Sequence, residues 1–260
     1  MLDAILVLKI TIAPALVLGA SYAGKRWGHV VSGWLVSLPL SSAPVVFLLA
    51  LERGSVFASK SAEGAILGFA SLSAFSLVYS LLSLRFKFSW FPSIFFGWCV
   101  FFLFAFILQS VEVSLVVAFI CVVSWLLFVV RLLPKSSFTG GVASGNYSNW
   151  TILARIIAAM SLIFLITEYA PLLGPKLSGL LAPFPIYTSV LTLSIHRRQG
   201  AAYSVEFVRG GTVGLFTSAV FFLIVGSLIV GLGVSASYLL AILASLIIHS
   251  FLLSLLRKNA

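Results

Sequence analysis

The chain has 260 residues, of which 61% are hydrophobic and 8% are charged, whereas soluble domains have about 25% charged residues. A soluble core of this size cannot hide so much apolar surface, so we expect lipid to surround most of the chain, which excludes an ordinary soluble domain. The net charge of +10 fits the surplus of basic residues in cytoplasmic loops of membrane proteins, and no basic run with interleaved aromatic residues indicates nucleic-acid binding.

The first apolar segment follows Asp3 and precedes the basic pair Lys25 and Arg26. A cleaved signal peptide usually carries its basic residues before the apolar core, so this order favours a retained first helix. The small residues Ser21 and Ala23 leave a cleavage site open.

Runs of about 20 apolar residues can cross a bilayer core of roughly 30 Å as helices. The chain contains nine such runs, which predict an all-α polytopic membrane protein. In chain order the expected spans are 4–21, 32–51, 64–84, 90–109, 112–133, 152–170, 178–195, 210–231 and 235–256.

The basic residues predict the orientation of these spans. Twelve Lys and Arg residues fall near the loops after spans one, three, five and seven or at the C-terminus, and three (Arg53, Lys60 and Lys176) fall on the other side. Because cytoplasmic loops are enriched in basic residues, we expect the N-terminus outside and the C-terminus in the cytoplasm.

The one long polar stretch covers residues 134–150 and is rich in glycine and serine, which is typical of a flexible linker. We expect it to be cytoplasmic. It divides the chain into a first membrane unit at 1–133 and a second at 151–260.

The second unit repeats the first at a shift of 146 residues. The segment GHVVSGWLVSLPLSSAP at 28–44 aligns without a gap with GPKLSGLLAPFPIYTSV at 174–190. Over residues 28–77, ten of 50 positions are identical, and all five glycines of that window align with glycine. An odd number of spans, five, separates equivalent helices, so we expect two units of inverted topology, a recurrent feature of transporters.

Equivalent prolines, Pro39 and Pro185, lie inside the second and seventh expected spans, where each removes a helical hydrogen bond. Freed backbone groups are tolerated in lipid only when they are buried in protein or face a wet cavity, so two broken helices are expected to line a substrate-binding site. The alternative is a pair of packing kinks whose hydroxyl groups bond to their own helices. The hydroxyl residues that follow the prolines complete this candidate site: Ser41, Ser42, Tyr187, Thr188 and Ser189.

Lys9 and Arg155 are equivalent cations in the first helix of each unit. Charges inside a membrane are costly and usually functional, so both are candidate binding residues for a carboxylate, a phosphate or a lipid headgroup. The alternative is that both long side chains reach the membrane interface from nearby span ends.

Charged residues just beyond the proline-containing spans are candidate gating residues, and ordinary interfacial charges would have the same pattern. They are Glu52, Arg53, Glu206 and Arg209.

No catalytic constellation is visible, because Asp3 is the only aspartate and neither an HExxH motif nor a Gly-rich phosphate loop occurs. Cys99 and Cys121 lie in apolar runs without a CxxC partner, and the three histidines are not at metal-ligand spacing. A membrane enzyme is therefore the third choice of function, and no metal or cofactor is expected.

Each unit resembles the small GlpM-like bacterial membrane proteins. The resemblance is carried by Lys9, by SGWLVSLPL at 32–40 with ERG at 52–54, and by SGLLAPFPIYTSV at 178–190. The second unit keeps a cation at Arg155 but has Arg198-Gln199 in place of the acid–base pair. The resemblance covers roughly residues 1–84 and 150–256. It implies a fused pair of such units in a bacterial inner membrane, loosely associated with glycerol metabolism and alginate-type exopolysaccharide production, and it implies no particular substrate.

Together these patterns predict a transporter or channel with a preference for a small anionic or phosphorylated solute or a lipid. The alternative is a non-transporting membrane scaffold for envelope-polysaccharide production. A polar cavity at Pro39 and Pro185 would favour transport, and a dry glycine-packed seam would favour the scaffold.

Overall fold

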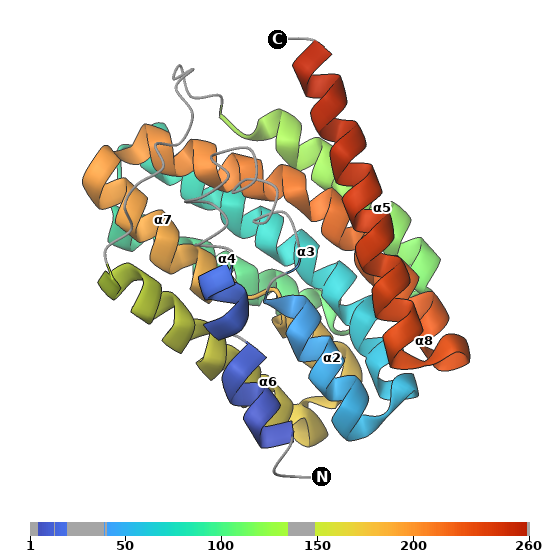
Figure 1. The fold of residues 1–260 in the computed structure, drawn as a ribbon. Helices are drawn as coiled ribbons and strands as arrows, with labels where there is room; N and C mark the ends of the chain where they lie inside the picture. Colours follow the sequence, from blue (N-terminus) through green and yellow to red (C-terminus); the bar gives the residue numbers. More distant parts are fainter. Residues whose placement is uncertain (1–4, 13, 20–38, 40, 135–148, 259–260) are drawn as a thin grey trace.

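The computed structural model describes residues 5–12, 14–19, 39, 41–134 and 149–258, and all regular structure within these ranges is helical (Figure 1). An N-terminal helix is described at residues 5–12 and 14–19. The later helices are α2 (Ser42–Arg53), α3 (Ser55–Leu84), α4 (Trp90–Leu108), α5 (Leu115–Leu132), α6 (Asn149–Leu181), α7 (Ile186–Gln199) and α8 (Ala201–Lys258). The predicted all-α architecture is confirmed.

Five helical segments are long and apolar enough to cross a membrane: Ser55–Leu84, Trp90–Leu108, Leu115–Leu132, Trp150–Leu181 and Ala201–Ile248. Helices α4 and α5 carry large apolar side chains on their outer faces, such as Phe95, Phe106 and Ile120, which are at least half exposed. Apolar faces of this extent are unfavourable in water. These features indicate a membrane-embedded protein.

The helix boundaries agree with some of the expected spans and correct others. The spans expected at 64–84, 90–109 and 112–133 lie in α3, α4 and α5, and the span at 152–170 lies in α6. The two spans expected at 210–231 and 235–256 both lie in α8, which bends at Gly233. The span expected at 178–195 is divided between the end of α6 and α7. Residues 20–38 and 135–148, which hold the start of the second span and most of the linker, lie outside the described residues.

Helices α3 and α8 begin nine residues before the spans expected at residues 64 and 210. The chain turns at single glycines instead of at the charged segments that follow them. Gly54 has φ 86° and ψ 168°, and Gly200 has φ 96° and ψ 174°, a conformation essentially restricted to glycine. Each turn therefore takes one residue, and the charged segment after it continues as helix.

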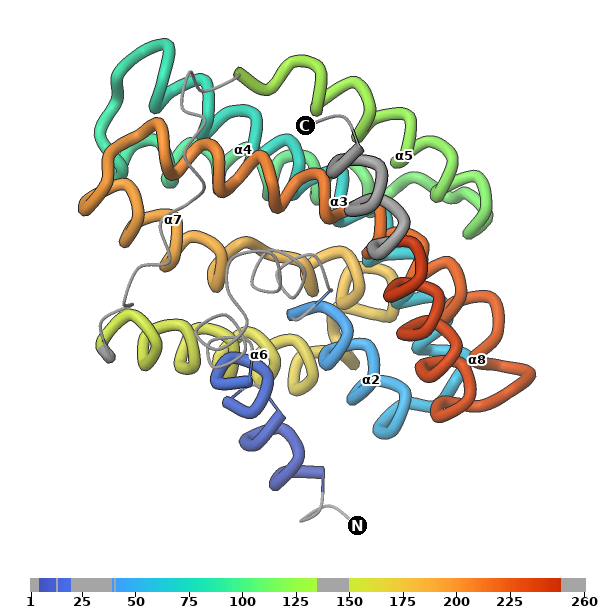
Figure 2. The backbone as a smooth tube through the Cα atoms, turned by 45° about the horizontal axis from the view of Figure 1, so that its top comes forward, coloured from blue at the N-terminus to red at the C-terminus, as the bar shows by residue number. Residues whose placement is uncertain are grey.

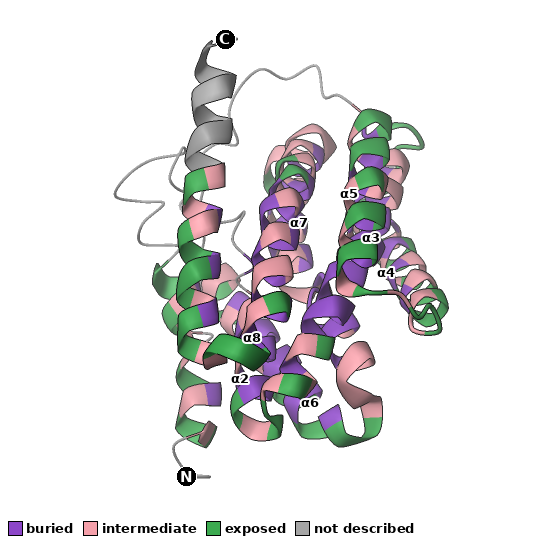
Figure 3. Cartoon of the chain, turned by 90° about the vertical axis from the view of Figure 1, so that its right-hand side faces the viewer, coloured by how far each residue is buried: buried purple, intermediate pink, exposed green. Residues whose placement is uncertain are grey.

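Helix α3 is the central helix of the fold and packs against α2, α4, α5, α6 and α8. In its most apolar 18-residue window 72% of residues are buried, against 22% in α5. Figure 3 shows the exposed residues spread over α5 and the buried residues gathered on the inner helices. Most of the protein core is therefore built around α3.

Three glycines bring α3 into backbone contact with residues 176–183. A Cβ atom on Gly64 would collide with the Lys176 carbonyl, and one on Gly68 would collide with Leu180 and Pro183. From the other side, a Cβ atom on Gly179 would collide with the backbone of Ser61. We call this contact the glycine seam. Small residues at helix interfaces allow this close approach in membrane proteins.

Helices α2 and α7 are short, and their ends match at the repeat shift. Helix α2 ends at Arg53 and α7 ends at Gln199, 146 residues later, and α3 and α8 begin at Ser55 and Ala201, also 146 apart. Figures 1 and 2 show α2 and α7 leaving the middle of the molecule in opposite directions.

Candidate functional site

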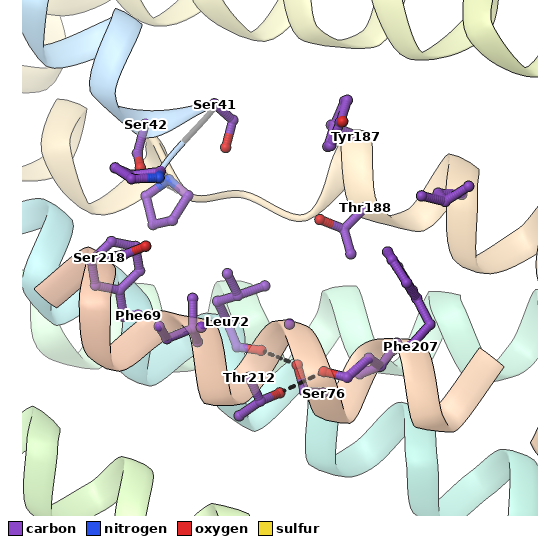
Figure 4. A pocket seen from close by; sticks show the side chains of 17 residues that line it. Ser41, Ser42, Phe69, Leu72, Ser76, Tyr187, Thr188, Phe207, Thr212 and Ser218 are labelled. Atoms are coloured by element: carbon purple, nitrogen blue, oxygen red, sulfur yellow. Dashed lines mark hydrogen bonds between the residues drawn. The ribbon is translucent and has the colours of Figure 1, made fainter. Parts of the chain in front are cut away.

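A cavity of about 80 Å³ lies where α2 and α7 begin (Figure 4). A buried water needs roughly 10–15 Å³ of such space, so the cavity has room for several waters or one small solute. Its described lining residues are Pro39, Ser41, Ser42, Phe69, Leu72, Ser76, Pro183, Tyr187, Thr188, Leu191, Phe207, Val208, Gly211, Thr212, Gly214, Leu215 and Ser218.

The two prolines determine where the short helices begin. The Pro39 carbonyl accepts a hydrogen bond from the Ala43 amide at 2.8 Å, and the Pro185 carbonyl accepts one from the Ser189 amide at 2.7 Å. These equivalent bonds form the first turns of α2 and α7. The first amides of a helix point away from its body and carry the positive end of the helix dipole, and here two such ends face one cavity.

The cavity is lined by matching residues from both units. Four pairs of its lining residues are 146 positions apart: Ser41 and Tyr187, Ser42 and Thr188, Phe69 and Leu215, and Leu72 and Ser218. The lining therefore draws on the same face of α2 and α7, and on the same face of α3 and α8.

The hydroxyl groups around the cavity differ in whether they already donate hydrogen bonds. Ser76 Oγ donates to the Leu72 carbonyl at 3.0 Å, and Thr212 Oγ1 donates to the Val208 carbonyl at 2.9 Å. The hydroxyls of Ser41, Ser42 and Thr188 form no hydrogen bond with another described residue, and the Ser42 side chain is only 1% exposed. Among the described lining residues, the hydroxyls without a hydrogen-bond partner therefore lie on the α2 and α7 side of the cavity.

Arg155 contacts this cavity through Tyr187. The Arg155 side chain is 3% exposed, its guanidinium donates to the Tyr187 hydroxyl, and its Cζ atom lies 4.4 Å from the centre of the tyrosine ring. The Tyr187 hydroxyl oxygen therefore accepts from a buried cation on α6, while the residue itself lines the cavity.

Lys9 lies away from the cavity, in an ion pair at the other end of α2. Its Nζ atom is 2.8 Å from Glu52 Oε1 and 3.7 Å from Glu168 Oε2, and it lies 5.9 Å from the centre of the Phe164 ring. Lys9 and Glu52 are 9% and 15% exposed, so this is a largely buried pair. Lys9 therefore links the N-terminal helix to α2 and α6.

The other predicted site residues are placed differently. Pro185 is the N-cap of α7, and Pro183 lines the cavity in its place. Ser189 points away from the cavity and accepts a hydrogen bond from Trp98 Nε1 at 3.0 Å. Of the four predicted gating residues, Glu52 pairs with Lys9, whereas Arg53, Glu206 and Arg209 form no ion pair with a described residue.

A stripe of polar residues leads from the cavity along α7. Thr188, Thr192 and His196 are spaced four residues apart and therefore share one helix face. Thr192 Oγ1 is buried without a hydrogen-bond partner among the described residues, and His196 Nδ1 is 2.8 Å from the hydroxyl of Tyr79 on α3. The Tyr79 hydroxyl also donates to Ser204 Oγ at 2.8 Å.

Sequence reasoning missed Ser76 and Thr212 and, in this stripe, Thr192 and His196. Leu72 and Ser218 are equivalent at the repeat shift, and both line the cavity. This equivalence is the sequence pattern that could have predicted the α3 and α8 side of the cavity. Nothing in the local sequence distinguishes Tyr79 from an ordinary core tyrosine.

Within the described part of the chain, no group of three or more His, Cys, Asp or Glu residues is placed to hold a metal ion. Cys99 and Cys121 are free and exposed on α4 and α5.

No protein-family model, no curated protein and no solved structure matches the chain. The resemblance to GlpM-like proteins thus stays a prediction, and the function is argued from the site alone.

Proposed function

We propose that the chain is a transporter or channel for a small anion, with its binding site in the cavity between the N-termini of α2 and α7. The observation that carries the proposal is the convergence of two helix N-termini on one cavity that is partly lined by hydroxyl groups. Interrupted helices whose positive ends face an anionic substrate near the membrane midplane are a recurrent design in secondary transporters.

We propose further that the two units are inverted repeats of a nine-span bundle, with the N-terminus outside and the C-terminus in the cytoplasm of a bacterial inner membrane. The opposite directions of α2 and α7 and the four matching pairs of cavity residues support this arrangement. In it the cavity lies on the axis that relates the units, so that each unit supplies one broken helix to a shared site.

The polar stripe on α7 supports transport because it continues the cavity toward one end of the molecule. A buried hydroxyl without a partner costs stability, and Thr192 is such a group within the described part of the chain. In the proposed orientation α7 ends at the cytoplasmic face, so the stripe would lead a solute between the cavity and the cytoplasm.

The proposal is tested by anion flux into liposomes that contain the purified full-length protein. Gly211 lines the cavity and has open space where a side chain would lie, so Gly211→Phe is expected to fill the cavity and to abolish flux. Gly231 lies on the same helix with open space around it and an exposed position, so Gly231→Phe is the matched control and should keep flux. Absence of flux in the wild type for every anion of a broad panel would refute the proposal.

The glycine seam favours a second candidate, a non-transporting scaffold for envelope-polysaccharide production. Backbone contact between α3 and residues 176–183 makes that part of the molecule rigid. A scaffold role depends on the rigid glycine seam and does not depend on the cavity. Loss of polysaccharide production on deletion of the protein, restored equally by wild type and by Gly211→Phe, would favour the scaffold.

A further inference from the structure

We infer that the cavity binds a short-chain monocarboxylate, an anion that combines one carboxylate with a small apolar body. This inference rests on the proposed function, because it names the substrate class of the same cavity. Its test measures binding, so it is separable from flux.

The cavity has one side rich in hydroxyl groups and one side that is mainly apolar. The donor side consists of the first residues of α2 and α7, where Ser41, Ser42 and Thr188 have hydroxyls free of bonds to described residues. Tyr187 lies beside them in the lining, with its hydroxyl oxygen accepting from the Arg155 guanidinium. A carboxylate is acceptor-only and takes up to four such bonds, which matches this side.

The opposite side belongs to α3 and α8 and is mainly apolar. Phe69 and Leu72 come from α3, and Phe207, Val208 and Leu215 come from α8. Three hydroxyl residues also lie on this side, and two of them, Ser76 and Thr212, donate to their own helices; the third is Ser218. Figure 4 shows Ser41, Ser42, Tyr187 and Thr188 along one edge of the pocket and Phe69, Leu72 and Phe207 along the other. An apolar tail fits against this second side.

Charge favours a singly charged anion over the doubly charged oxyanions that a phosphate site would take. None of the described lining residues is charged, and the Arg155 guanidinium donates to the Tyr187 hydroxyl. A buried dianion requires paired cations, whereas a single negative charge can be held by hydroxyls and two helix N-termini. A cavity of about 80 Å³ also excludes a lipid headgroup with its chains.

The test is equilibrium binding of radiolabelled butyrate to the purified full-length protein in detergent, with unlabelled competitors. Butyramide has the same shape without the charge and is expected to compete at least about tenfold less well, because hydrogen bonds to a charged group are the stronger ones. Acetate lacks two methylene groups and is expected to compete about tenfold less well. Phosphate should not compete at matched concentration.

Tyr187→Phe removes the hydroxyl of a lining residue and is expected to weaken butyrate binding about tenfold. Tyr169 is an exposed tyrosine on α6, so Tyr169→Phe makes the same chemical change away from the cavity and should bind as the wild type does. Thr188→Val removes the neighbouring donor and replaces the first variant if Tyr187→Phe does not elute as a folded protein.

The outcomes separate the two proposals. Butyramide or phosphate competing as well as butyrate, or no saturable butyrate binding, would overturn the inference even if inorganic anions cross the liposome membrane. Saturable butyrate binding that depends on Tyr187, together with absence of flux, would uphold the inference and overturn transport.

Discussion

Helices α2 and α7 begin at the same cavity and run in opposite directions, but the faces that lead away from the cavity differ. Along α2 the positions equivalent to Thr188, Thr192 and His196 are Ser42, Val46 and Ala50, each 146 residues earlier. Val46 is fully buried and Ala50 is 5% exposed. The α2 side is therefore closed by apolar packing, whereas the α7 side keeps polar groups in its interior.

The two helices also end in different contacts. Helix α2 ends at the ion pair between Lys9 and Glu52, and α7 ends at the hydrogen bond between Tyr79 and His196. The cation of the second unit, Arg155, binds instead near the start of α7, at Tyr187. The two buried cations thus lie at opposite ends of the short helices that they contact.

The ion pair of Lys9 should have the largest effect on stability. Lys9→Met leaves Glu52 largely buried without its cation, which we expect to lower the free energy of unfolding by about 2–3 kcal/mol. The double variant Lys9→Met/Glu52→Gln removes both charges and should recover most of that loss. The measurement is unfolding by sodium dodecyl sulfate in mixed micelles.

Lys60 provides the control for this prediction. Lys60 pairs with Glu63 at 3.1 Å, but its side chain is 62% exposed, so Lys60→Met should change stability by less than about 1 kcal/mol. Equal effects of Lys9→Met and Lys60→Met would show that the α2 end is not held by a buried charge.

The two glycine turns should respond alike, because they are equivalent. Gly54→Ala and Gly200→Ala each force a residue with a Cβ atom into a positive-φ conformation, at an expected cost of about 2 kcal/mol. Gly210 lies inside α8 with open space around it, so Gly210→Ala should be neutral or slightly stabilising. A cost at only one of the two turns would contradict their structural equivalence.

The sequence predicted those parts of the site that depend on local chemistry. Pro39 and Pro185 were expected to interrupt the second and seventh spans, and in the structure they lie just before α2 and α7, because proline lacks an amide proton and is tolerated where a helix begins. Residues after each proline line the cavity. Ser189 was wrongly grouped with its neighbours Tyr187 and Thr188, since the next step around the helix turns it toward Trp98 on α4.

Contacts between distant segments could not be predicted in this way. Glu52 and Glu168 surround Lys9 from two other helices, and no local pattern pairs them. The repeat alignment also makes Phe69 and Leu215 equivalent positions, and both residues line the cavity. The alignment could therefore have predicted them as a pair of site residues.

The hydrogen bond at the end of α7 should have a smaller effect than the ion pair at the end of α2. Tyr79→Phe removes the hydroxyl that connects His196 and Ser204, for an expected loss of about 1–1.5 kcal/mol. Tyr169→Phe makes the same change at a tyrosine that is 51% exposed and should leave the unfolding midpoint unchanged. If the two variants unfold alike, the Tyr79 hydroxyl does not hold α3 to α7.

The smallest expected change in stability has the opposite sign and separates stability from function. Thr192→Val removes a buried hydroxyl that has no partner among the described residues, so the protein should gain about 1 kcal/mol. The same change gives position 192 the valine found at the equivalent position on α2 and interrupts the polar stripe, so anion flux should fall.

The reciprocal variant, Val46→Thr, introduces a hydroxyl at the equivalent position on α2, where Val46 is fully buried, and should lose about 1–2 kcal/mol without raising flux. A Thr192→Val protein that is both more stable and fully active would mean that the polar stripe is a packing defect. A more stable but slower protein would mean that the chain keeps a destabilising hydroxyl on the side where the solute moves.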